Sequence, residues 1–205
     1  AIIASLFIIA GGSTNFMIAA GLIHLSHVFD CMDGQMARYR KTTSLSGGYY
    51  DKLTDQIQVI LWFGAIGYAA YFQSHEVLPV FLAFIGVAFY SLRGYVKYVV
   101  IYEEMSRNSG YLKKLSIEDS EVKKANVAGL GFGLLANIKW FLSEQQKIIL
   151  FNEGVFIFML SLALVLDELT LMLWVFAASQ LYYGLARGWL RGYQIENNLK
   201  INIEK

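Results

Sequence analysis

Four of the chain's six aspartates lie at the ends of two neighbouring apolar segments, with spacings that could build a metal site. Asp30 and Asp33 are three positions apart, and Asp51 and Asp55 are four positions apart. On a helix, each spacing puts both carboxylates on one face. Four carboxylates brought together would repel one another unless cations neutralised them, and Mg²⁺ and Ca²⁺ prefer oxygen ligands. Four such ligands fit a two-metal site, with ions about 3.5–4 Å apart, that holds a phosphate group.

Three small residues accompany these aspartates at helical spacing. Gly34 and Ala37 follow Asp30 by about one and two turns, and Gly47 precedes Asp51 by one turn. Small side chains allow a helix backbone or a flat ligand to approach closely. Capping of helix ends or plain solvent exposure would explain one pair of aspartates. Two pairs with three small residues on the same faces favour a binding site.

The composition shows what kind of protein must position these groups. Hydrophobic residues make up 56% and charged residues 16% of the 205 residues, and the mean hydropathy is +0.45. Soluble domains contain about 25% charged residues, so these values argue against a soluble globule. The net charge of +1 gives no reason to expect nucleic-acid binding. A single cysteine, Cys31, excludes an intramolecular disulfide and a zinc site built from cysteines.

Six apolar segments are candidates for membrane helices, each of which needs about 20 residues to cross the bilayer. We therefore predict an all-α integral membrane protein, a polytopic bundle of six transmembrane helices that forms a single domain over residues 1–205. Residues 1–12 are interpreted as the tail of a truncated first helix. A polar loop is expected at 105–127, followed by a short helix or re-entrant segment at 128–145. The other five predicted spans are residues 14–40, 48–72, 78–104, 147–166 and 169–193.

The 17 basic residues all fall on one side of this predicted topology. The loops around 11–13, 73–77 and 166–168 contain no lysine or arginine. Since cytoplasmic loops carry the excess of Lys and Arg, the opposite side is predicted to be cytoplasmic. The four aspartates lie on that side. We therefore expect an integral protein of the cell or inner membrane whose active site faces the cytoplasm.

Together, the aspartates and small residues resemble the signature of the CDP-alcohol phosphotransferase (CDP-alcohol phosphatidyltransferase) family. That signature reads D-x-x-D-G-x-x-A-R, about eight residues, and then G-x-x-x-D-x-x-x-D. Every fixed position is present, from Asp30 to Arg38 and from Gly47 to Asp55. The direct match covers the second and third predicted spans, and the six-span topology is similar to that of the family as well.

The resemblance implies a membrane-embedded, divalent-metal-dependent transferase, commonly a homodimer. Such an enzyme moves a substituted phosphate group from a CDP-linked alcohol or lipid to the hydroxyl of an acceptor alcohol, and it releases CMP. The process would be phospholipid synthesis or a related phosphodiester synthesis. Two Mg²⁺ or Mn²⁺ ions would be the cofactors. The resemblance adds membrane lipid as a partner and gives no role to nucleic acid.

The signature also implies a role for each matched residue. The metal ligands would be the four aspartates, Asp30, Asp33, Asp51 and Asp55. Asp55 would in addition act as the general base on the acceptor hydroxyl. The nucleotide pocket would be formed by Gly34, Ala37, Arg38 and Gly47. Within it, Arg38 would lie near the diphosphate or brace the site.

Two pairs of basic residues at helical spacing are candidates for binding an anion. Arg93 and Lys97 are four positions apart in the fourth predicted span, and Arg187 and Arg191 repeat the spacing at the end of the sixth. Charges inside a membrane are commonly functional, so the first pair would bind the phosphate of an acceptor or of a lipid donor. The alternative is that these side chains extend to the membrane surface. For the second pair, anchoring at the cytoplasmic surface is the favoured interpretation.

Two other functions would use the same aspartates. A cation transporter would place its carboxylates near the middle of the bilayer among interrupted helices, whereas these lie at one membrane face. Another metal-dependent membrane enzyme, such as a diphosphate hydrolase, would share the metal chemistry and differ in the acceptor. Release of CMP from a CDP-linked substrate separates the transporter from the transferase.

Overall fold

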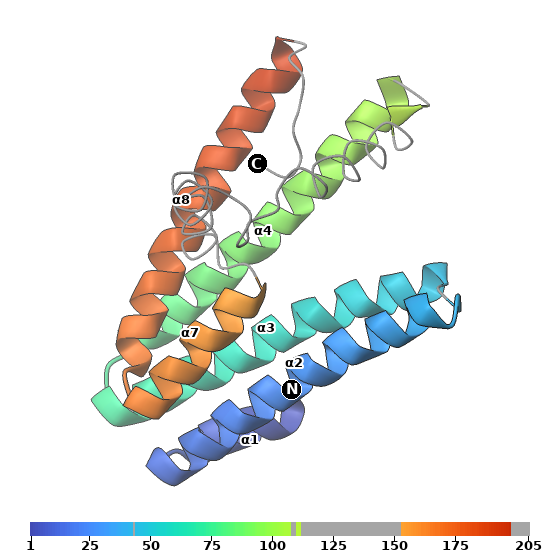
Figure 1. Cartoon of the computed structure of the whole chain (residues 1–205). Helices are drawn as coiled ribbons and strands as arrows, with labels where there is room; N and C mark the ends of the chain where they lie inside the picture. Colours follow the sequence, from blue (N-terminus) through green and yellow to red (C-terminus); the bar gives the residue numbers. More distant parts are fainter. Residues whose placement is uncertain (43, 108–109, 112–152, 198–205) are drawn as a thin grey trace, which may run out of the picture.

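A computed structural model of the chain describes residues 1–42, 44–107, 110–111 and 153–197. The fold is all-helical in these residues, as predicted (Figure 1). The six described helices are α1 (Ile2–Ala10), α2 (Ser13–Tyr39), α3 (Leu45–Ser74), α4 (Leu78–Arg107), α7 (Glu153–Leu166) and α8 (Leu169–Glu196).

Three of the described helices are long and apolar enough to cross a membrane: α2, α4 and α8. In its described part, α7 is a shorter apolar helix, and α1 has nine residues. Helix α3 has 30 residues, but polar side chains from Asp51 to Gln58 interrupt its first half. The three long apolar helices support the membrane character of the chain, whereas the number of six spans stays a prediction.

The helix ends differ from the predicted boundaries on the side of the aspartates. Helix α3 begins at Leu45, so the turn after α2 is shorter than predicted and Gly47 lies inside the helix. The hydroxyl of Ser44 caps this helix by accepting a 3.0 Å hydrogen bond from the Gly47 amide. Serine is a preferred residue at this position, which explains where the helix starts.

The predicted polar loop at 105–127 is also wrong at its start, because α4 continues to Arg107. The described residues do not include most of the rest of that loop or the predicted segment at 128–145. They also do not include the first residues of the predicted span at 147–166.

The described helices form two pairs that diverge from a common base (Figure 1). Helices α2 and α3 are joined by a short turn as a hairpin, and α1 packs against both of them (Figure 1). Helices α4 and α8 form the second pair, and α3 contacts both of its members. Helix α7 lies between the pairs and contacts α2 and α8.

An aromatic cluster closes the base of the bundle. The rings of Phe63 and Phe176 stack with their centroids 3.7 Å apart, so they join α3 to α8. Phe156 of α7 packs beside Phe63 at 5.5 Å and stacks near Trp62 at 6.1 Å. Fully buried aromatic rings contribute much of the packing energy of a core. The polar first half of α3 lies beyond this cluster, toward the open side of the bundle.

Two contacts between glycine and phenylalanine set the distance between α4 and α8. The ring of Phe176 occupies the space that a Cβ atom on Gly86 would need. In the second contact the glycine is on α8 and the ring on α4: the ring of Phe89 lies 2.8 Å from where a Cβ atom on Gly184 would be. Small residues let helices approach closely. These contacts therefore fix which residues face one another in the following turns of both helices.

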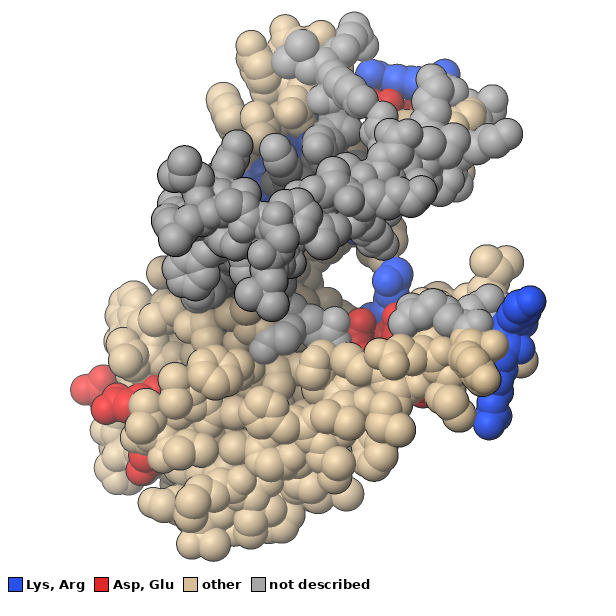
Figure 2. Space-filling view, viewed as in Figure 1, with Lys and Arg blue, Asp and Glu red and all other residues tan. Residues whose placement is uncertain are grey.

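Charge is distributed unequally along the bundle. On the face shown in Figure 2, lysine and arginine atoms lie toward the upper and right parts, and the lower left end carries acidic atoms. At the turns that join α3 to α4 and α7 to α8 the chain carries Glu76, Asp167 and Glu168. A 2.6 Å hydrogen bond from Gln73 to Asp167 ties these two turns together. Within the described residues the charge asymmetry expected from the sequence is present, and its orientation relative to the cytoplasm stays a prediction.

Candidate metal and anion site

Three aspartates from two helices meet on the open side of the bundle. Asp30 of α2 and Asp51 and Asp55 of α3 offer carboxylate oxygens that all lie within 4.8 Å of one another. Asp30 and Asp55 are half-buried, and Asp51 is exposed. The short connection between α2 and α3 makes the helices neighbours, so the face carrying Asp30 meets the face carrying the α3 pair.

Asp33 is not part of this group of three. Its side chain is exposed, and it lies one turn farther along α2, toward the connection to α3. Three of the four aspartates predicted to converge are therefore brought together in the described residues. The role of Asp33 as a ligand stays a prediction.

The size of this carboxylate group suits a hard divalent cation. Oxygens that share one Ca²⁺ ion lie about 2.3–2.6 Å from it, which allows up to about 5 Å between them. For Mg²⁺ the limit is about 4 Å, so small rotations of the side chains would bring the oxygens into range. Carboxylate oxygens are the preferred ligands of both ions. The group therefore fits one such ion without a change of the helix positions.

A large cavity, here named the basic cavity, opens between α3, α4 and α8 next to Asp55. Its volume is about 1130 Å³, and the hollow is visible between the two helix pairs in Figure 2. Gln56 and Ser91 lie in its wall, where a 2.7 Å hydrogen bond between their side chains joins α3 to α4. The basic side chains in the wall are Lys52, Arg93, Lys97, Arg187 and Arg191.

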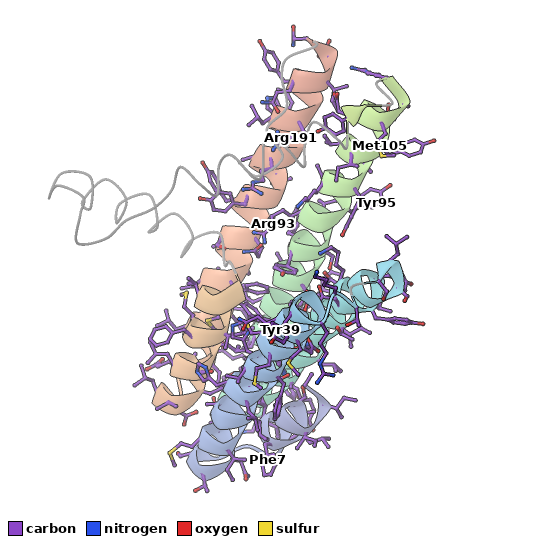
Figure 3. The ribbon with its side chains drawn as sticks, turned by 45° about the vertical axis from the view of Figure 1, so that its right-hand side comes forward. Phe7, Tyr39, Arg93, Tyr95, Met105 and Arg191 are labelled. Carbon is purple, nitrogen blue, oxygen red and sulfur yellow. The ribbon has the colours of Figure 1, made fainter. Side chains whose placement is uncertain are left out.

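Both pairs of basic residues that the sequence indicates as anion-binding candidates line this cavity together with Asp55. Arg93 is half-buried and lies over the ring of Tyr90, and Arg187 lies over the ring of Tyr183 at 6.0 Å. Arg191 is only 7% exposed and donates a 2.9 Å hydrogen bond to Gln194. In Figure 3, Arg93 of α4 and Arg191 of α8 lie on the sides where these two helices face each other. The cavity therefore combines a strong positive charge with a carboxylate at its edge.

A second cavity, here named the inner chamber, lies on the other side of Asp55. It has a volume of about 80 Å³ and is lined by both Asp30 and Asp55. Tyr90 and Asp55 line both cavities, so these two side chains form the boundary between them.

The residues predicted to line a nucleotide pocket lie close to the aspartates in the sequence, on the same two helices. Gly34 and Ala37 are half-buried on α2, and Gly47 is exposed in the first turn of α3. Arg38 belongs to α2, and the position of its side chain lies outside the described structure. The basic cavity and the inner chamber, as far as their walls are described, do not include Gly34, Ala37 or Gly47.

Sequence reasoning missed the aromatic and amide side chains around the aspartates. Gln58 and Trp62 line the inner chamber, and both continue the helical face of Asp55 at spacings of three and four. Tyr90 precedes Arg93 by three residues, which is the spacing of neighbours on one helix face. Extending the aspartate and arginine faces by one or two turns would have found all three.

A family model described as CDP-alcohol phosphatidyltransferase matches residues 1–138 of the 205 residues. The matched range contains the group of three aspartates and the α4 part of the basic cavity. Arg187 and Arg191 of α8 lie after it. A search of curated proteins and a search of solved structures each gave no match to the chain.

Proposed function

Because the chain belongs to the CDP-alcohol phosphatidyltransferase family, we propose that it transfers a substituted phosphate group from a CDP-linked alcohol or lipid to the hydroxyl of an acceptor alcohol. CMP is the second product. The observation that carries this proposal is the meeting of Asp30, Asp51 and Asp55 within 4.8 Å, next to a cavity with five basic side chains.

In this proposal, the aspartates bind Mg²⁺ or Mn²⁺. Asp30, Asp51 and Asp55 would hold one ion, and Asp33 would contribute to a second ion. Bound ions of this kind neutralise the charge of a diphosphate and stabilise the departing CMP. The contribution of the chain is to hold the carboxylates where the diphosphate has to lie, at the edge of the basic cavity.

Asp55 is proposed to be the catalytic base. It belongs to the group of three aspartates and also lines the basic cavity, so a hydroxyl bound in that cavity can come within its reach. Its carboxylate accepts the proton of the acceptor hydroxyl, and the oxygen forms a bond to the phosphorus that carries the donor alcohol. The bond from that phosphorus to the CMP oxygen breaks, and CMP leaves with the electron pair. General bases placed in this way accelerate reactions about 10²–10⁴-fold.

The basic cavity is proposed to bind an anionic group of the acceptor or of a lipid donor. Arginine forms two hydrogen bonds to a phosphate with its planar fork, and three arginines line the cavity. Arg93 lies within an apolar helix that is long enough to span a membrane. A charge in that setting is costly unless it is paired or faces a polar cavity, and Arg93 faces one.

The donor nucleotide is proposed to bind along α2 and the start of α3. Gly34, Ala37 and Gly47 would leave room for the flat cytosine and the ribose, and Arg38 would contact the diphosphate. The diphosphate would then lie between the nucleotide and the basic cavity. We also propose that this side of the membrane is the cytoplasm, because a nucleotide is water-soluble and the basic residues gather there.

The test is an assay of CMP release by the full chain in lipid vesicles. CDP-linked lipid and CDP-linked small alcohols are each offered with phosphorylated and unphosphorylated acceptor alcohols. We expect CMP release that needs both an acceptor and Mg²⁺ and that stops in excess EDTA. CMP release without an acceptor would instead indicate a diphosphate hydrolase. The absence of CMP with every pair of substrates, together with Mn²⁺ flux into vesicles, would support a cation transporter and refute the proposal.

A further inference from the structure

The inner chamber extends from the aspartates toward the aromatic cluster at the base of the bundle. Its wall combines several polar side chains with a larger apolar surface. The polar side chains in the wall are His27, Asp30, Asp55, Gln58, Trp62 and Tyr90. The apolar part is formed by Val59, Phe156 and Ile157.

Trp62 brings an unsatisfied hydrogen-bond donor to this chamber. Its side chain is 1% exposed, and within the described part of the chain its Nε1–H has no acceptor in reach. A buried N–H group without an acceptor destabilises the folded state, and buried polar groups in native proteins nearly always have a partner. The position of Trp62 in the wall of a chamber that two carboxylates also line therefore points to a hydrogen-bonding occupant.

Gln58 lies between Trp62 and Asp55 on the same face of α3. The three residues follow one another at spacings of three and four, so they occupy successive turns and all line the chamber. Trp62 is seven residues after Asp55, which is about 10.5 Å along the helix axis. Both side chains lean toward the N-terminus, so the lean shortens this gap only by the greater length of the indole. A hydrogen bond spans about 2.8–3.0 Å, so two intervening waters joined by three hydrogen bonds span about 8.4–9.0 Å and close most of the gap.

The size of the chamber fits water, and polar side chains line part of it. One water needs about 10–15 Å³ of such volume, and the chamber has about 80 Å³. A buried water also needs two to four polar partners, which the aspartates, Gln58 and Trp62 supply. An acyl chain would leave the buried Nε1–H of Trp62 without an acceptor, which disfavours a lipid tail.

We propose that the inner chamber holds ordered water that links the Nε1–H of Trp62, with Gln58, to the carboxylate of Asp55. Trp62 and Gln58 are then positioning residues for the transfer reaction. This inference rests on the proposed function, in which Asp55 accepts the proton of the acceptor hydroxyl. The indole only donates and an ionised carboxylate only accepts. Water between them therefore turns its lone pair to Trp62 and its O–H to Asp55, and it fixes the rotamer of that carboxylate.

A Trp62→Phe variant tests the donor without removing the ring. Trp62 stacks near Phe156 at 6.1 Å with an interplanar angle of 26°, and phenylalanine can keep this contact. The matched control is Trp174→Phe in α8, where the side chain is 49% exposed. We expect Trp62→Phe to lower kcat about tenfold, the usual worth of one hydrogen bond, while KM for the CDP-linked donor changes less than twofold. The control should keep wild-type kinetics.

A double-mutant cycle tests whether the two residues act through the same water. Gln58→Leu alone should also lower kcat about tenfold, and the variant with both changes should lose little more than either one. Additive losses, or a normal kcat for Trp62→Phe, would overturn the positioning role.

A measurement that does not depend on activity tests the water itself. In the ¹⁵N-labelled full chain in detergent, the indole N–H signal of Trp62 is the one that disappears in Trp62→Phe. We expect this signal to show a cross-peak to water, although the side chain is buried. A missing cross-peak would overturn the inference. If the wild type releases no CMP, the proposed function fails, and the cross-peak still decides whether the chamber is hydrated.

Discussion

The guanidinium carbon of Arg93 lies 5.0 Å from the centroid of the Tyr90 ring, and Tyr90 forms part of the boundary between the two cavities. A cation above an aromatic face is attracted by about 0.5–2 kcal/mol. The contact therefore holds the Arg93 side chain on the wall of the basic cavity that Asp55 also lines, rather than letting it extend toward the membrane surface.

The first prediction concerns substrate binding by Arg93. Arg93→Ala should raise the KM of one substrate, the one with the anionic group, at least about tenfold, because a charged hydrogen bond contributes about 1.5–3 kcal/mol. Arg93→Lys should have an intermediate effect, since lysine keeps the charge and loses the planar fork. Steady-state kinetics with each substrate varied in turn measure both effects.

The control for this experiment is Arg107→Ala, at the end of the same helix and exposed. It should leave the KM of every substrate within twofold. Normal kinetics of Arg93→Ala with every substrate would show that Arg93 is a membrane anchor. A loss of affinity for the CDP moiety would place the nucleotide, and not the acceptor, in the basic cavity.

The second prediction concerns the metal ligands. Asp30→Asn and Asp51→Asn should each lower turnover at least about 100-fold. Loss of a residue that only hydrogen-bonds to a metal ligand already lowers metal affinity or activity about 10–100-fold, and loss of the ligand itself should cost more. Asp33→Asn should raise the Mg²⁺ concentration needed for half-maximal activity, if Asp33 holds a second ion. Activity is titrated with Mg²⁺ after EDTA treatment, and thermal unfolding in detergent checks that each variant is folded. Wild-type activity in excess EDTA would refute a metal-dependent reaction.

The third prediction separates binding from chemistry at Asp55. Asp55→Asn should lower kcat about 10²–10⁴-fold, the usual contribution of a general base. Binding of a CDP-linked donor should persist, because the remaining aspartates and the nucleotide residues are unchanged. Calorimetric titration with the donor and a single-turnover assay measure the two quantities. Normal turnover of Asp55→Asn would assign the base to another residue.

The group of three aspartates is the part of the site that follows most directly from the sequence. Helical spacing is short-range information, so the pairing of Asp51 with Asp55 follows from the sequence alone. Meeting Asp30 required only that a short connection make α2 and α3 neighbours. The same rule places Asp33 near Asp30 along the chain, but its approach to the other three aspartates depends on how α3 lies beside α2, so its role as a ligand stays a prediction.

The basic cavity could be predicted only in part. Arg93 and Lys97 stood out because charged residues are rare in an apolar helix. Their meeting with Arg187 and Arg191 depends on the packing of two helices that are distant in the sequence. That packing is set by the Gly86 contact with Phe176 and by its counterpart at Gly184, and no local pattern identifies such partners.

The fourth prediction concerns that packing. In Gly86→Ala, the new Cβ would occupy space that the ring of Phe176 now fills. This ring is stacked on Phe63 at 3.7 Å and has little freedom to move. We expect a loss of about 1–3 kcal/mol, as is usual for overpacked cores, seen as a lower unfolding temperature in detergent. Gly64→Ala is the matched control, because its Cβ would meet no described atom within 4 Å. Equal stability of the two variants would refute this account of the α4 and α8 contact.

The last prediction concerns orientation in the membrane. In a Cys31→Ala background, single cysteines are placed at Ser74 and Glu168 at one end of the bundle and at Lys41 at the other. The first two lie near turns that carry acidic residues, and Lys41 lies in the turn beside the aspartates. Since cytoplasmic loops carry the excess of basic residues, a membrane-impermeant maleimide should label Ser74→Cys and Glu168→Cys in intact cells. It should label Lys41→Cys only after permeabilisation. The opposite pattern would put the aspartates and the basic cavity on the outer face, where no cytoplasmic nucleotide could reach them.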